Sequence, residues 1–171
     1  ADLSINEYNK VVYKKGSAKI TEPNDKSNEI KQFETIVQND PFVHKENPYD
    51  DFKDEILLPH KNSTLGPALA VGDINNDSME DYIIGGAIAQ APGIFIQQED
   101  GSFKKINIPI FEKDKFYEDL GIEIFDADND GDNDVYIASG GNEFNEGSQG
   151  YEDRFYENKG NLNFDRNKTA I

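Results

Sequence analysis

Short apolar segments alternate with polar turn residues over much of the chain. Four such segments lie close together, at residues 68–71, 82–84, 94–97 and 103–108. Each break between them carries Gly, Asp, Asn or Pro, which are the residues that turns favour. Apolar segments of this length between such breaks predict β-strands. An all-β fold is therefore expected for this region.

The pattern of strands and turns occurs twice. Residues 69–85 align with residues 122–138 at an offset of 53 positions. Further along, the alignment matches Ile94 of the first copy with Arg154 of the second. The second copy is longer between these landmarks, and the extra residues fall in a polar stretch at 142–151, which predicts a loop.

Four strands in a unit that repeats about every 50 residues are typical of the blades of a β-propeller. A meander of unrelated hairpins is the alternative, but it does not explain the internal repeat. The predicted fold is thus a partial β-propeller of four-stranded blades. The expected divisions are an N-terminal extension with an irregular lead-in and room for part of a blade, a first blade and a second blade, at residues 1–62, 63–115 and 116–171.

The N-terminal division has little regular pattern. Strands are expected at residues 11–13 and 33–37, and residues 21–29 hold no apolar side chain, which predicts a mobile linker. Residues 41–62 mix turn formers with a few apolar anchors and are expected to be irregular. Because two blades cannot close a ring, further blades are expected from the same protein or from a partner chain.

The charge of the chain limits its partners. There are 34 acidic residues against 17 Lys and Arg, which gives a net charge of −17. This charge repels nucleic-acid backbones and anionic lipids, so neither is an expected partner, whereas cations are. No apolar run is long enough for a transmembrane helix. The absence of Cys excludes disulfides, a thiolate nucleophile and a Cys-based zinc site.

Each copy carries an acidic loop between its first two strands. The loops place side-chain oxygens at positions 1, 3, 5 and 9, and position 7 offers its backbone carbonyl. Oxygen ligands without Cys or His select Ca²⁺ over zinc or copper. The sequence therefore predicts calcium, with these ligands: Asp73, Asn75, Asp77, Met79 and Asp81 in the first loop, and Asp126, Asp128, Asp130, Asp132 and Asp134 in the second.

An EF-hand begins with the same spacing but needs a bidentate Glu at position 12. Here Ile84 and Ile137 occupy position 12, within strand-like segments, so the position 9 aspartates are expected to complete each site. The first loop has Asn75 in place of Asp and Ser78 in place of Gly131, which predicts weaker binding there. Two alternatives stay open, namely solvated acidic turns without metal and an ion that only stabilises the loop.

The Asp-x-Asp-x-Asp-Gly-x-x-Asp loop resembles that of the FG-GAP or VCBS repeat, which occurs in integrin α-subunit propellers and bacterial surface proteins. Gly85-Gly86-Ala87 also resembles a feature of that repeat. The stretch at residues 44–52, together with Ser63-Thr-Leu-Gly-Pro67, is similar to the lead-in of bacterial surface proteins related to the cartilage acidic protein family. The resemblance covers about residues 42–166. It implies a calcium-binding propeller that is extracellular or at the cell surface, either on the bacterial outer surface or in the periplasm.

The favoured function is therefore binding of a protein or a glycan by a surface protein. The alternatives are a fragment of a propeller-fold polysaccharide lyase and a structural subunit of a larger surface assembly. No catalytic or organic-cofactor residues are assigned. By residue type alone, His60, Ser63 and an Asp could form a Ser-His-Asp catalytic triad, but the sequence lacks a nucleophile elbow. His44 and Glu46 are expected to hold the lead-in by hydrogen bonds, and Phe144 and Tyr151 to pack under their own loop or to contact a ligand.

Overall fold

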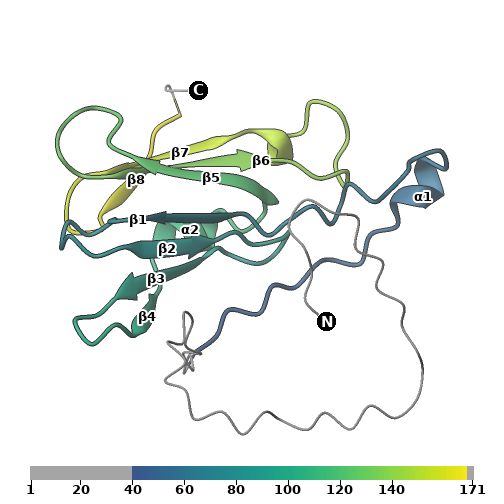
Figure 1. Cartoon of the computed structure of the whole chain (residues 1–171). Helices are drawn as coiled ribbons and strands as arrows, with labels where there is room; N and C mark the ends of the chain where they lie inside the picture. Colours follow the sequence, from purple (N-terminus) through teal and green to yellow (C-terminus); the bar gives the residue numbers. More distant parts are fainter. Residues whose placement is uncertain (1–39, 169–171) are drawn as a thin grey trace, which may run out of the picture. The chain divides into compact units, whose positions relative to one another are not determined.

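The computed structural model describes residues 40–168 and contains two four-stranded antiparallel sheets. Each sheet is a meander in which neighbouring strands are consecutive in the chain (Figure 1). The sequence-predicted strands at 11–13 and 33–37 and the linker at 21–29 lie outside the described residues. The strands are β1 Leu69–Gly72, β2 Asp81–Ile84, β3 Gly93–Gln97 and β4 Phe103–Ile106 in the first sheet, and β5 Asp119–Phe125, β6 Asp134–Ser139, β7 Arg154–Asn158 and β8 Phe164–Arg166 in the second.

The first sheet confirms the four predicted strands, with one difference at its end. β4 ends at Ile106, two residues earlier than predicted, because Pro109 begins the short helix α2 (Pro109–Lys113). Proline suits the first turn of a helix, because the backbone N–H groups of that turn have no acceptor within the helix and the N–H that proline lacks is not needed there. Phe111 of α2 packs against Tyr156 and Phe164 of the second sheet, with ring centroids 4.4 and 5.5 Å apart.

The strand registers correct one part of the sequence alignment. Tyr82 pairs with Phe95 in the first sheet, and Val135, its counterpart, pairs with Tyr156 in the second. Phe95 therefore corresponds to Tyr156, and the match of Ile94 with Arg154 was wrong by one residue. A Phe at the next position in both strands, Phe95 and Phe155, caused the error.

The two sheets pack on one another through unlike faces. In the first sheet the buried face carries Ala70, Ile83 and Ile94, whereas the second sheet contributes Ile122 and Ile137 to the same core. By the offset between the copies, Ala70 corresponds to Glu123, which lies on the opposite face of the second sheet. The core thus joins one face of the first sheet to the opposite face of the second.

The lead-in is irregular, as predicted, apart from the one-turn helix α1 (Asp51–Asp54). Its anchor is the buried Asp51, whose carboxylate accepts the backbone N–H groups of Asn62 and Ser63 at 2.9 and 3.0 Å and the Ser63 hydroxyl. Burial acts to raise the pKa of Asp51, but these hydrogen bonds outweigh it and lower the pKa to about 2. His44 and Glu46, which the sequence analysis expects to hold the lead-in, hydrogen-bond each other within it, at 2.8 Å between Nε2 and Oε1. Within the described residues no helix is long and apolar enough to cross a membrane.

The close approach of β1 to β5 makes a testable prediction about Gly72. A Cβ at Gly72 would lie 2.9 Å from Cγ2 of Ile124, so the Ile124 side chain or the sheets themselves would have to shift. Gly72→Ala is expected to cost about 1–3 kcal/mol of unfolding free energy through overpacking. Urea denaturation measures the change. Gly121→Ala is the control, since its Cβ would meet Ala138 at an ordinary 3.4 Å. Equal stability of the two variants would contradict the packing described here.

Candidate metal-binding loops

The two acidic loops have the same backbone path. Each joins the first strand of its sheet to the second, and positions 4 and 6 of each are left-handed. The φ angles are +62° at Asn76 and +69° at Ser78 in the first loop, and +61° at Asn129 and +95° at Gly131 in the second. Ser78 therefore adopts the turn that Gly131 adopts, although a non-glycine residue in this region costs about 1–2 kcal/mol. The two loops are equivalent in conformation as well as in spacing.

In the second loop the carboxylates at positions 1, 3 and 5 converge. Asp126, Asp128 and Asp130 each offer an oxygen, and these oxygens lie within 4.8 Å of one another. The three side chains also organise the turn, because they accept the backbone N–H groups of Gly131, Asp130 and Asp132 respectively, at 2.9–3.2 Å. The other oxygen of Asp126, Oδ1, is buried and has no hydrogen-bond partner. A cation would satisfy it and reduce the repulsion of the three charges.

The position 9 aspartates have a role that the sequence did not reveal. Both are fully buried. Asp134 accepts the N–H of Ala127 at 3.0 Å and that of Asn158 at 2.8 Å, one on each oxygen. Asp81 likewise accepts the N–H groups of Ile74 and Gln97. Each therefore ties the start of its loop to the third strand of its sheet, and neither belongs to the converging group of positions 1, 3 and 5.

In the first loop the side chains at positions 1, 3 and 5 are already paired with one another or with the backbone. Asn75 donates its amide to Asp77 Oδ2 at 2.9 Å, and Asp77 Oδ1 accepts the N–H of Met79. Asp73 accepts the N–H groups of Asp77 and Ser78. The amide of Asn75 supplies a donor where the second loop has a carboxylate, which agrees with the weaker binding expected for this loop.

The two loops also contact each other, which the sequence analysis did not predict. Asn76 donates to the carbonyl of Gly131 at 2.9 Å and to Asp132 Oδ1 at 2.6 Å. In the reverse direction, Asn133 donates to the carbonyl of Asp73 at 2.6 Å. Asn158 donates its amide to the carbonyls of Ile74 and Asn133, both at 3.2 Å. The signal in the sequence is Asn76 at position 4 of the first loop, which reaches the second loop rather than an ion.

The catalytic alternative finds no support at the residues that suggested it. The hydroxyl of Ser63 donates to Asp51, and His60 is exposed and has no described contact with either, so the three do not form a triad. Phe144 and Tyr151 pack under their own loop, with ring centroids 5.6 Å apart and the Tyr151 hydroxyl donating to the Phe144 carbonyl at 2.7 Å.

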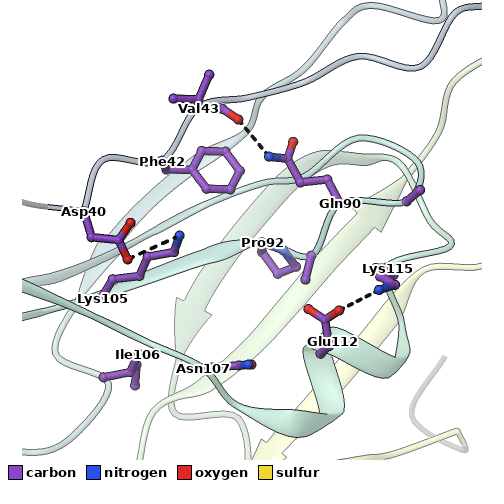
Figure 2. A pocket seen from close by; sticks show the side chains of 12 residues that line it. Asp40, Phe42, Val43, Gln90, Pro92, Lys105, Ile106, Asn107, Glu112 and Lys115 are labelled. Carbon is purple, nitrogen blue, oxygen red and sulfur yellow. Dashed lines mark hydrogen bonds and ion pairs between the residues drawn. The ribbon is translucent and has the colours of Figure 1, made fainter.

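A cavity of about 560 Å³ lies between the lead-in and the turn that precedes β3 (Figure 2). Its charged groups pair among themselves, since Lys105 contacts Asp40 at 3.7 Å and Lys115 contacts Glu112 at 2.6 Å. Gln90 closes one side by donating to the carbonyl of Val43 at 2.8 Å. No charge in this cavity is left for a ligand, so it is not a candidate site.

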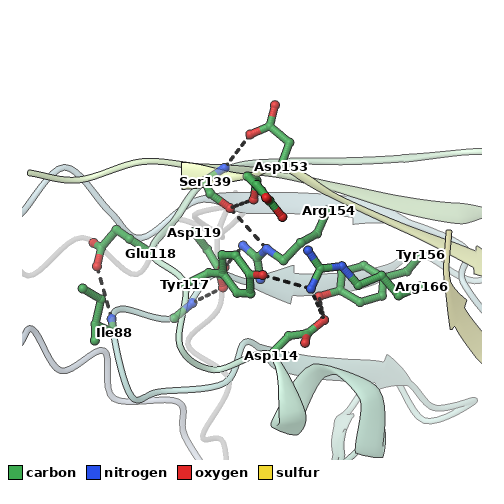
Figure 3. Close-up of polar contacts among 12 residues, drawn as sticks. Ile88, Asp114, Tyr117, Glu118, Asp119, Ser139, Asp153, Arg154, Tyr156 and Arg166 are labelled. Atoms are coloured by element: carbon green, nitrogen blue, oxygen red, sulfur yellow. Dashed lines mark hydrogen bonds and ion pairs between the residues drawn. The ribbon is translucent and has the colours of Figure 1, made fainter. Parts of the chain in front are cut away.

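A buried polar network surrounds the start of β5 (Figure 3). Arg154 pairs with Asp119 at 2.5 Å and stacks over the Tyr117 ring at 4.4 Å. Asp119 also accepts the N–H of Gly86 at 2.7 Å, which links the two sheets. Its neighbour Glu118 points away from Arg154, toward the N–H of Ile88. Burial, together with the charges of nearby carboxylates, raises the pKa of Glu118 to about 7.

Comparison with known proteins agrees with the repeat. Residues 73–137 match the protein-family model of the FG-GAP-like repeat. The match begins at position 1 of the first acidic loop and extends through the second loop into β6. Over these residues the chain is similar to FG-GAP-like repeats. No curated protein and no solved structure gives a significant match to the chain.

The two kinds of aspartate in the second loop should respond differently to substitution. Asp134→Asn places an amide where the N–H groups of Ala127 and Asn158 now find acceptors, so it is expected to cost about 1–3 kcal/mol with or without calcium. Asp130→Asn removes one charge from the converging group and is expected to weaken stability only when calcium is present. Urea denaturation in calcium and in chelator measures both. A calcium-dependent loss for Asp134→Asn alone would contradict this division of roles.

Proposed function

We propose that the chain is a calcium-stabilised segment of a larger FG-GAP-like β-propeller in an exported or cell-surface protein, and that the complete propeller binds a protein or a glycan. The observation that carries the proposal is the convergence of Asp126, Asp128 and Asp130 around a buried oxygen that no protein group satisfies. The family match and the second loop of identical path support it.

The residues of the second loop fit calcium. The donors are carboxylate oxygens, which hard cations prefer, and a flexible loop suits the 6–8 oxygens that Ca²⁺ takes. Asp126, Asp128 and Asp130 would hold the ion, with the Asp132 carbonyl as a further ligand. The sequence also predicts Asp134 as a ligand, but both of its oxygens accept backbone N–H groups, so its role here is to hold the loop in shape. In the first loop the corresponding ligands are Asp73, Asn75, Asp77, the Met79 carbonyl and Asp81. The bound ion would neutralise the loop and stiffen the turn.

The packing of the two blades supports a continuation of the repeat. The first sheet packs with one of its faces and the second sheet with the opposite face. Each sheet therefore keeps the face that the other has used, and the same packing can be repeated until a ring closes. The unused faces carry exposed apolar side chains, with Leu69 and Val71 exposed by 63% and 58% on β1 and Phe125 by 44% on β5. These faces fit further blades, from the same protein or from a partner chain.

The proposed location follows from the ion and the family. Calcium is abundant outside cells, and the resemblance is to proteins of bacterial surfaces, including relatives of the cartilage acidic protein family. A polysaccharide lyase or a purely structural subunit are the competing functions. Unsaturated sugar ends on incubation with polysaccharides would identify a lyase, and co-purification with fixed partners would identify a structural subunit. Affinity for a protein or glycan without turnover is the result expected here.

Calcium should stabilise the folded chain. An ion that binds only the native state adds about 2.7 kcal/mol when its free concentration is 100 times Kd. Chelation is therefore expected to lower Tm, and Asp130→Ala to remove the difference between calcium and chelator. Differential scanning calorimetry measures both. Asp165→Ala, which removes an exposed carboxylate outside the loops, is the control and should keep the calcium response. A Tm that does not change when calcium is chelated would exclude a calcium ion that stabilises the fold.

The isolated chain should not behave as a self-sufficient domain. Its unlike apolar faces are expected to cause association or loss of cooperativity when residues 1–171 are produced alone. Light scattering after size-exclusion chromatography and calorimetry measure these properties. Val71→Lys, which charges one of the faces, is expected to increase the monomeric fraction. A monodisperse wild-type monomer with a sharp two-state transition in calcium would contradict the proposal that the chain needs further blades.

A further inference from the structure

Six buried side-chain polar atoms in residues 40–168 have no hydrogen-bond partner. One is Asp126 Oδ1 in the second acidic loop. The other five lie outside both loops, and they are His44 Nδ1, Glu46 Oε2, Asn47 Oδ1, Glu118 Oε1 and Glu143 Oε1. Unsatisfied buried polar atoms are rare in native proteins, and a missing ion is one of their ordinary explanations. We call these five residues the lead-in cluster.

Three members of the lead-in cluster, His44, Glu118 and Glu143, come from separate segments and lie close together. Glu46 is near enough to Glu118 to oppose its ionisation, and Asn47 follows Glu46 in the chain. A Cβ built on Gly66 would lie 3.5 Å from His44 Cε1 and 3.7 Å from Glu118 Oε1, so these two side chains flank the same spot. A Cβ on Gly141 would lie 3.6 Å from Glu118 Cβ and would collide with Glu143 Oε2. The missing side chains of both glycines leave room for the cluster.

Glu118 is the central member. Its side chain is fully buried, and only its Oε2 has a partner, the N–H of Ile88 at 3.2 Å. The carboxylates of Glu46 and Glu143 are close enough to oppose its ionisation. Arg154 does not relieve this, because its guanidinium pairs with Asp119. Several carboxylates thus surround a buried oxygen that no protein donor reaches.

We propose that His44, Glu46, Asn47, Glu118 and Glu143 form a second cation site, which binds one divalent metal ion between the lead-in and the blades. The proposal goes beyond the calcium loops and does not depend on them. The acidic loop joins the end of β5 to the start of β6, whereas Glu118 precedes β5 and Glu143 follows β6. Because β5 and β6 are antiparallel, the lead-in cluster lies at the opposite end of the sheet.

The donors distinguish this site chemically from the loops. His44 Nε2 lies 2.8 Å from Glu46 Oε1, and donation of its proton there leaves the lone pair of Nδ1 for a ligand. Imidazoles that bind metals commonly donate their other N–H to a carboxylate in this way. One imidazole nitrogen and four oxygens suit an ion such as Mn²⁺, whereas the all-oxygen loops suit Ca²⁺. The side chains would close on the ion, and the ion would tie the lead-in to the second blade.

Pulsed electron paramagnetic resonance of bound Mn²⁺ tests the site directly. The chain, produced without a histidine tag and stripped of metal, is loaded with Mn²⁺ and examined for coupling to ¹⁴N. Coupling is expected in the wild type and should be lost in His44→Gln. The chain has only one other histidine, so His60→Gln is the matched control and should keep the signal. Absence of ¹⁴N coupling in wild-type protein would overturn the proposal without recourse to any variant.

Counting bound Mn²⁺ by native mass spectrometry separates this site from the loop. Glu118→Gln and Glu143→Gln should each lose one ion per chain or weaken its binding at least tenfold, and Asp130→Asn should lose a different one. The double variant Glu118→Gln, Asp130→Asn should lose both. Glu146→Gln, which removes an exposed charge from the same loop as Glu143, should bind as the wild type does. Unchanged Mn²⁺ binding in both Glu118→Gln and Glu143→Gln would refute the second cation site. Unchanged binding in Asp130→Asn would refute only metal binding by the second acidic loop.

Discussion

One buried aspartate in each sheet joins the acidic loop to the rest of the sheet. The carboxylate of Asp134 joins the beginning of the second acidic loop, at Ala127, to the end of the third strand of its sheet, at Asn158. Asp81 does the same in the first sheet. A buried carboxylate is costly unless its charge is met by hydrogen bonds, and here two backbone N–H groups on different elements meet it. The loop can therefore hold its remaining carboxylates in a fixed path before any ion is present.

The packing of one sheet on the other involves the same loops. Asn76 and Asn133 join loop to loop across the sheets, and Asn158 reaches the first loop from the third strand of the second sheet. These contacts, with the approach of β1 to β5, join one sheet to the other. The contacts use different positions on the two sheets. Asn129, at position 4 of the second loop, is equivalent to Asn76.

Much of the fold was predictable because it follows from local pattern. The apolar segments of the first copy predicted β1 to β4, and Pro109 accounts for the early end of β4. The acidic spacing predicted the convergence of positions 1, 3 and 5 in the second loop. What sequence reasoning missed depends on contacts between distant residues. The role of Asp134 needs Asn158, 24 residues away. The register of β7 was misread because the insertion is followed by two adjacent aromatic residues, Phe155 and Tyr156, either of which can match Phe95.

The acidic charge of the chain is concentrated where it has a structural use. Carboxylates crowd at one end of the sheets in the acidic loops, and at the other end around Glu118, where burial disfavours the charged state. Within residues 40–168 no salt bridge involves Glu118 or the three converging carboxylates of the second loop, and the buried Arg154 pairs with Asp119 instead. Repulsion of this kind is tolerable only if protons or cations offset it. The lead-in, with little regular structure of its own, gains a defined position because Asp51 fixes one part of it and the lead-in cluster brings another part against the second blade.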